Sequence, residues 1–189
     1  NDSGEAIVSC DFLRALKTNR SEVPSTKLIS NFAREIETSK SNEDLKFKIE
    51  KYMNIEKILS YAVVDYTIRN DDGVFHWYCE GESCENHNYY WIEEPSEEKV
   101  YLIPWDLDNA FDNLIKDMDP VTPIADSWGE TSDDCEAFPY GYLNIFQKSA
   151  ACDKLIGGWA LYRERFNELK AEFINGPFSF IEANSNIDE

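Results

Sequence analysis

The sequence has few positive charges and no long apolar run. Its 18 Lys and Arg stand against 37 Asp and Glu, for a formal net charge of −19. Such a surface repels a phosphodiester backbone and anionic lipids, so we expect no nucleic-acid partner. The longest apolar stretches span only a few residues, which excludes membrane insertion. Residues 1–5 are polar and lack a signal-peptide pattern, so any secretory signal has been removed or lies in sequence not shown.

Aromatic side chains, in contrast, are abundant. They make up 14% of 189 residues, and hydrophobic residues make up 42%. A chain of this length and composition can bury one sizeable core without metals or disulfides. We therefore predict a single domain over residues 1–189.

The cysteine spacing lacks the paired CxxC pattern of a zinc site. The five cysteines are Cys10, Cys79, Cys84, Cys135 and Cys152. Disulfides suit this spacing better, with Cys79 bonded to Cys84 and Cys135 to Cys152. Cys10 is then left over, either as a buried thiol or as the mate of a cysteine in an upstream segment. Disulfides predict a secreted or cell-surface protein.

Apolar residues recur at helical spacing in most of the chain. The predicted helices cover residues 3–17, 25–36, 41–52, 54–69 and 152–174, with a short one after Phe178. Between them, residues 89–93 and 99–104 are short aromatic and aliphatic runs that predict a β-hairpin. Residues 113–140 have no sustained period and predict a long loop. The fold class is therefore α+β, mostly helical, with a central β-hairpin.

The second run of the hairpin ends in acidic residues. Asp106 and Asp108 follow Trp105, and crowded carboxylates call for a divalent cation, for which Mg²⁺ or Mn²⁺ is the natural choice. An extended chain would place both on one face, whereas a turn would let only one reach the metal. The alternative is that they cap a helix beginning near Leu107. An EF-hand is excluded, because its glycine position holds Phe111.

A second polar cluster follows the helix predicted at residues 54–69. Asp72 lies in the Asn70–Gly73 turn, and Asn88 follows His87 further along. A carboxylate on a turn and an amide near a strand suit a general base and a metal ligand. The alternative interpretations are an ordinary turn and a structural imidazole.

These motifs together resemble the spore-coat protein H (CotH) kinase family. The resemblance rests on order and spacing: Asn70-x-Asp72-Gly73, then His87-Asn88-Tyr89-Tyr90-Trp91, then the block from Leu102 to Phe111. The insertion with Cys79 and Cys84 is similar to secreted members, and the stretch from Ala151 to Phe178 is similar to the family's C-terminal part.

The resemblance implies an atypical protein-kinase-like C-terminal lobe that uses ATP and Mg²⁺, with Mn²⁺ as the alternative, to phosphorylate Ser or Thr of a protein substrate. It implies that Asp72 is the catalytic residue and that Asp106 binds the metal. It further implies that Trp105 lies near the nucleotide, that Asn88 contacts metal or phosphate, and that Asp108 is an additional metal ligand.

The chain departs from this pattern at its start. It has no glycine-rich phosphate loop, so the nucleotide-cradling N-terminal lobe is expected to be absent and the isolated chain to bind ATP weakly with little turnover. Two other functions remain open. One is a metal-dependent glycosyltransferase, because Asp106-Leu107-Asp108 is also a DxD sequence. The other is a non-catalytic adhesion or structural module on the same fold.

Overall fold

The computed structural model describes residues 15–17, 25–68, 70, 72–81, 83–108, 110–111, 135–140 and 145–187. The chain forms two compact units, Asn1–Asn54 with Tyr90–Ile103, and Ile55–Tyr89 with Pro104–Glu189. Helices and small antiparallel sheets make up the described parts, so the predicted α+β class is confirmed. No described helix is long and apolar enough to span a bilayer. Most of the predicted helix at 3–17, and Cys10 within it, lies outside the described residues.

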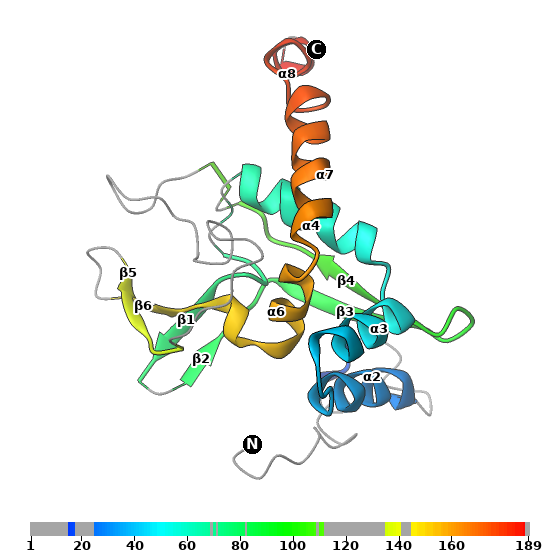
Figure 1. Cartoon of the computed structure of the whole chain (residues 1–189). Coiled ribbons are helices and arrows are strands. Elements are labelled where there is room, and N and C mark those ends of the chain that lie inside the picture. The colour runs from blue at the N-terminus through cyan, green and yellow to red at the C-terminus, as the bar shows by residue number, and fades with distance from the viewer. Residues whose placement is uncertain are drawn as a thin grey trace. The chain divides into compact units, whose positions relative to one another are not determined.

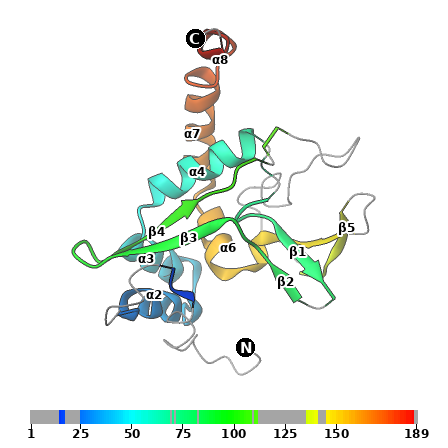
Figure 2. The same cartoon turned by 180° about the vertical axis from the view of Figure 1, so that it is seen from behind.

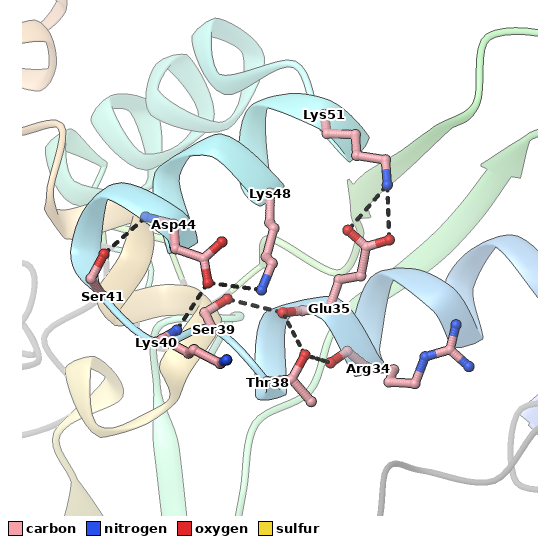
Figure 3. Close-up of polar contacts among 9 residues, drawn as sticks. All are labelled: Arg34, Glu35, Thr38, Ser39, Lys40, Ser41, Asp44, Lys48 and Lys51. Atoms are coloured by element: carbon pink, nitrogen blue, oxygen red, sulfur yellow. Dashed lines mark hydrogen bonds and ion pairs between the residues drawn. The ribbon is translucent and has the colours of Figure 1, made fainter.

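The first unit contains helices α2 (Lys27–Glu37) and α3 (Asn42–Tyr52), which lie side by side (Figure 1). The Ser41 side chain caps α3 by accepting the Asp44 N–H. Lys51 Nζ lies 2.8 Å from Glu35 Oε1 and joins the two helices, as Figure 3 shows. Phe32 packs on Tyr52 in the core of this unit, with ring centroids 5.5 Å apart.

Strands β3 (Tyr89–Glu94) and β4 (Lys99–Pro104) form the predicted hairpin, which lies almost entirely within the first unit. The Ile29 N–H donates to Glu93 Oε1 at 2.8 Å, which ties α2 to β3. The chain enters this hairpin from the second unit at Tyr89 and returns to it at Pro104. The first and last residues of the hairpin therefore belong to the unit that holds the predicted site.

The second unit is built around α4 (Ile55–Thr67), which crosses α7 (Arg163–Asn175) in both views (Figures 1 and 2). The Tyr66 ring packs edge-on against Phe166, and Arg165 forms a two-pronged ion pair with Glu56. The same unit contains helices α6 (Lys154–Ala160) and α8 (Phe180–Ile187) and the short 3₁₀ helix η1 (Ala150–Cys152). One continuous helix over 152–174 was the wrong prediction, because the chain turns at Leu161 and Tyr162 between α6 and α7.

A four-stranded antiparallel sheet also belongs to this unit, and the sequence analysis missed it. Its order is β2-β1-β6-β5, from strands β1 (Trp77–Glu80), β2 (Ser83–Glu85), β5 (Phe138–Tyr140) and β6 (Ile145–Lys148). Strand β5 corrects the loop predicted for residues 113–140. The disulfides Cys79–Cys84 and Cys135–Cys152 are both present, as predicted. The first joins β1 to β2 directly.

Candidate active site

The turn that follows α4 carries Asp72. The Asn70 N–H donates to the Asp65 carbonyl at 3.1 Å, and the His76 N–H donates to the Gly73 carbonyl at 3.0 Å. These two bonds close the turn on both sides of Asp72. Gly73 is buried at its centre, where a Cβ would lie 2.8 Å from Asn70 Nδ2. Any larger residue at that position would therefore push the turn out of shape.

Two asparagine side chains fasten the next segment onto this turn. Asn88 Nδ2 donates to the Asp72 carbonyl at 2.9 Å and to Asp72 Oδ2 at 2.8 Å. Asn86 Nδ2 donates to the Val74 carbonyl at 2.7 Å, and Tyr89 Oη donates to Asn86 Oδ1 at 2.9 Å. Two amides spaced two residues apart thus bind two carbonyls with the same spacing, and Asn88 also orients the Asp72 carboxylate.

Asn88 itself has a left-handed backbone, with φ at 60°. This conformation costs roughly 1–2 kcal/mol for most residues and less for Asn, whose short polar side chain can bond locally. It lets the side chain bind Asp72 while the backbone carbonyl accepts the Trp105 N–H at 3.0 Å. Since Nδ2 is directed at Asp72, the amide oxygen is the atom of Asn88 that can serve as a metal ligand.

The acidic segment after β4 is attached to the same region at both ends. Trp105 bonds to Asn88, and the Phe111 N–H donates to the Ile68 carbonyl at the end of α4 at 2.7 Å. Asp106 and Asp108 lie exposed between these anchors, and Asp106 has a left-handed φ of 58°. Neither carboxylate bonds to another residue within the described part of the chain. None of the described residues 105–108, 110 and 111 is helical, so there is no support among them for a helix capped by these aspartates.

The available donors suit a hard divalent cation. The carboxylates of Asp106 and Asp108 and the amide oxygen of Asn88 are all oxygen ligands, which Mg²⁺ and Mn²⁺ prefer. Over the described ranges, no group of three or more His, Cys, Asp or Glu residues is close enough to hold a metal. A metal here would therefore need the amide oxygen, the phosphates of a nucleotide, or water to complete its coordination. The Trp105 side chain is 45% exposed beside these groups.

His87 pairs with Asp72 through Nε2 and Oδ1, a contact that the sequence analysis did not predict. The His87 side chain is 50% exposed and that of Asp72 is 21% exposed. The two oxygens of Asp72 thus face different partners. Oδ2 is bound to the buried Asn88, whereas Oδ1 faces an imidazole that solvent can reach.

One of the comparisons with known proteins identifies the family of the chain. A family model described as CotH kinase protein matches residues 11–189. The chain belongs to the CotH kinase family. Comparisons with curated proteins and with solved structures found no match. The family resemblance seen in the sequence is thereby confirmed.

This CotH family protein also holds a buried polar cluster beneath the Asp72 turn. Its centre is Asp65 on α4, which is 2% exposed. Asp65 Oδ1 accepts from Asn70 Nδ2 at 2.8 Å and from Tyr61 Oη at 3.0 Å. His76 is 1% exposed, and its Nε2 lies 3.9 Å from Asp65 Oδ2.

Burial governs the protonation of this cluster. It raises the pKa of Asp65 to about 7, against the hydrogen bonds from Asn70 and Tyr61. It lowers the pKa of His76 to about 3, against the effect of the Asn70 backbone. Burial, followed by the Asp65 charge, also raises the pKa of Tyr61. Loss of water favours the neutral form of each group, which explains why the acid and the base shift in opposite directions.

The position of Asp65 in the α4 pattern could have revealed the cluster. Buried Ile58 and Ala62 lie seven and three residues before Asp65, so the carboxylate continues the apolar stripe. An acid at such a position needs buried donors.

Proposed function

We propose that the full-length protein is an ATP- and Mg²⁺-dependent kinase that phosphorylates Ser or Thr of proteins. The observation that carries this proposal is the Asp72 carboxylate held by Asn88, whose carbonyl in turn binds the acidic segment that contains Asp106. Phosphoryl transfer requires mainly placement and charge neutralisation from a protein. We further propose that the chain has the fold of an atypical protein-kinase-like C-terminal lobe.

Asp72 would orient the acceptor hydroxyl and take up its proton. Asn88 holds Oδ2 and fixes the plane of the carboxylate. Oδ1 faces His87, whose side chain is half exposed and can turn away. We infer that the substrate hydroxyl takes the place of His87 on Oδ1. A positioned base of this kind typically supplies about 10²- to 10⁴-fold in rate.

Asp106, Asp108 and the Asn88 amide oxygen would hold the metal ion. When bound, Mg²⁺ neutralises charge on the phosphates. The exposed indole of Trp105 offers a flat apolar surface for the nucleotide base. These assignments use side chains from two stretches of sequence that are fastened to each other through the Asn88 backbone.

We also propose that the protein works outside the cytosol, as a secreted or cell-surface protein. The support is the pair of bridges Cys79–Cys84 and Cys135–Cys152 in the described part of the chain, because disulfides persist in oxidising compartments. Its partners would be ATP and a protein substrate. The net charge of −19 favours a substrate with basic residues around the acceptor hydroxyl.

The test is transfer of label from γ-labelled ATP with Mg²⁺, using the full-length protein. We expect Asp72→Ala and Asp106→Ala each to reduce labelling of a protein acceptor by at least about 10²-fold. Glu182→Ala removes an exposed carboxylate from α8 and is the matched control, with labelling unchanged. Unchanged labelling in both Asp variants would overturn the site assignment.

The same assay separates the competing functions. A glycosyltransferase would transfer sugar from a labelled sugar nucleotide with Mn²⁺ and give no label from ATP. An adhesion or structural module would transfer neither. It would also keep its biological role in the Asp106→Ala variant, whereas a kinase would lose that role.

A further inference from the structure

We propose that Asp65 is the positioning residue that fixes the Asp72 turn, although it never reaches the surface. The proposal rests on the proposed function for the role of Asp72, and on the hydrogen bonds of the buried cluster for the role of Asp65. Asp65 lies in the last turn of α4 and is 2% exposed. It can therefore touch no substrate and can act only through its neighbours.

Asp65 holds Asn70 at two points. Its side-chain Oδ1 accepts from Asn70 Nδ2 at 2.8 Å, and its main-chain carbonyl accepts the Asn70 N–H at 3.1 Å. Two bonds between the same two residues fix both the backbone and the side chain of Asn70. Tyr61 Oη donates to the same Oδ1 from one helical turn earlier, which fixes the rotamer of Asp65.

Asn70 passes this constraint on to Asp72. Asn70 Oδ1 lies 3.5 Å from the Asp72 nitrogen, at the outer limit of a hydrogen bond. Gly73 packs over the amide group so closely that a Cβ there would lie 2.8 Å from Nδ2. The position of the Asn70 side chain thus sets the path of the backbone through Asp72 and Gly73.

Truncation of Asp65 would leave the buried Asn70 amide and the partly buried Tyr61 hydroxyl without their acceptor. Asn70 is 1% exposed, so its amide would have to move to regain a partner, and the turn would move with it. A misplacement of about 1 Å at a catalytic group can cost about 10²-fold in rate. An Asn at position 65 keeps one oxygen for both donors and places its amide nitrogen toward His76.

The experiment compares Asp65→Ala, Asp65→Asn and Leu59→Ala in the full-length protein. Leu59 is fully buried on the same helix and makes an apolar control for lost stability. Asp65→Ala should lower kcat per folded molecule by about 10²-fold with KM for ATP nearly unchanged. Asp65→Asn should recover most of that loss, and Leu59→Ala should leave kcat per folded molecule unchanged.

Amide hydrogen exchange gives a second readout that does not depend on activity. Asp65→Ala should speed exchange at the Asn70 and His76 amides, which close the turn, beyond the change in global stability, whereas Leu59→Ala should not. Equal losses of kcat in Asp65→Ala and Leu59→Ala, or unchanged exchange at the turn, would overturn the proposal. If the wild type transferred no phosphate, the proposed function would fail, and exchange alone would decide whether Asp65 positions the turn.

Discussion

Buried Asp65 and His76 should each make the stability of the fold depend on pH, with opposite signs that cancel in the wild type. Burial raises the pKa of Asp65 to about 7 and lowers that of His76 to about 3. Between about pH 4.5 and 6.5 the folded protein therefore carries a proton on Asp65 and none on His76. The unfolded chain carries one on His76 and none on Asp65. The folded and unfolded states thus each bind one proton at these two residues. Their two contributions to the slope of the free energy of unfolding against pH therefore cancel.

Single substitutions should expose each contribution with its own sign. In Asp65→Asn only His76 remains, and the unfolded state binds more protons, so the free energy of unfolding rises with pH relative to wild type. In His76→Phe only Asp65 remains, and the folded state binds more protons. The free energy of unfolding therefore falls as pH rises, relative to wild type. One pKa unit corresponds to about 1.4 kcal/mol, which gives a relative change of about 2 kcal/mol between about pH 4.5 and 6.5 in either variant.

The measurement is urea unfolding of wild type, the two single variants and the Asp65→Asn/His76→Phe double variant at several pH values. The other ionisable groups are common to all four proteins and cancel in the differences. The free energy of unfolding of the double variant should differ from that of wild type by the same amount at every pH, because both titrating groups are gone. Single-variant curves that run parallel to wild type would show that these groups titrate normally in the folded state and would refute the reasoning.

Two further predictions concern the site, and a third concerns a disulfide. Gly73→Ala places a Cβ 2.8 Å from a buried amide nitrogen, so it should lower the free energy of unfolding by about 1–3 kcal/mol in urea and also lower the rate of transfer. Asn88→Ala should reduce labelling from ATP by about 10²-fold, whereas His87→Ala should change it by only a few-fold, because the substrate hydroxyl displaces His87; equal losses would contradict this. Replacing both cysteines of the Cys135–Cys152 bridge by Ala should cost about 3 kcal/mol by thermal or urea unfolding, and intact mass under non-reducing conditions checks the bridge.

The helices of the first unit could be predicted because their signals are local. The apolar period of α2 and α3 and the Ser41 cap lie within a few residues of one another, and the structure confirms them. The hairpin was predictable for the same reason, since two short apolar runs flank a polar connection. Local agreement between pattern and structure is typical of such elements.

The sheet of the second unit could not be predicted in this way. Strands β1 and β6 pair through Trp77 and Lys148, which are far apart in the sequence. Each strand has only four residues, and β1 and β6 mix polar and aromatic side chains without alternation. These segments become strands because they pair with each other. A partner so far away in the sequence leaves no pattern in the residues of either segment. The break between α6 and α7 was missed because the apolar period continues through Leu161 and Tyr162.

At the site, too, residues that belong to sequence motifs could be named in advance, whereas contacts between distant side chains could not. The motif residues could be singled out only with the help of the family resemblance, because their spacing alone left an ordinary turn and a helix cap open. The structure brings Asp72, Asn88 and Trp105 together through backbone and amide bonds. The role of His87 as partner of Asp72, and of Asp65 beneath the turn, depends on side chains that meet only in three dimensions.

Amide bonds hold the carboxyl groups of Asp65 and Asp72 in a chain whose net charge is −19. Asn88 binds Asp72, Asn70 binds Asp65, and Asn86 binds a carbonyl of the same turn. Amide donors hold these groups in place without neutralising them, whereas a Lys or Arg at the same positions would cancel the negative charge that the proposed metal site requires. Asp65 adds little negative charge of its own, because burial raises its pKa to about 7 and keeps it largely protonated below that pH. Replacing Asn88 by a basic residue should therefore weaken metal binding even if the turn kept its shape.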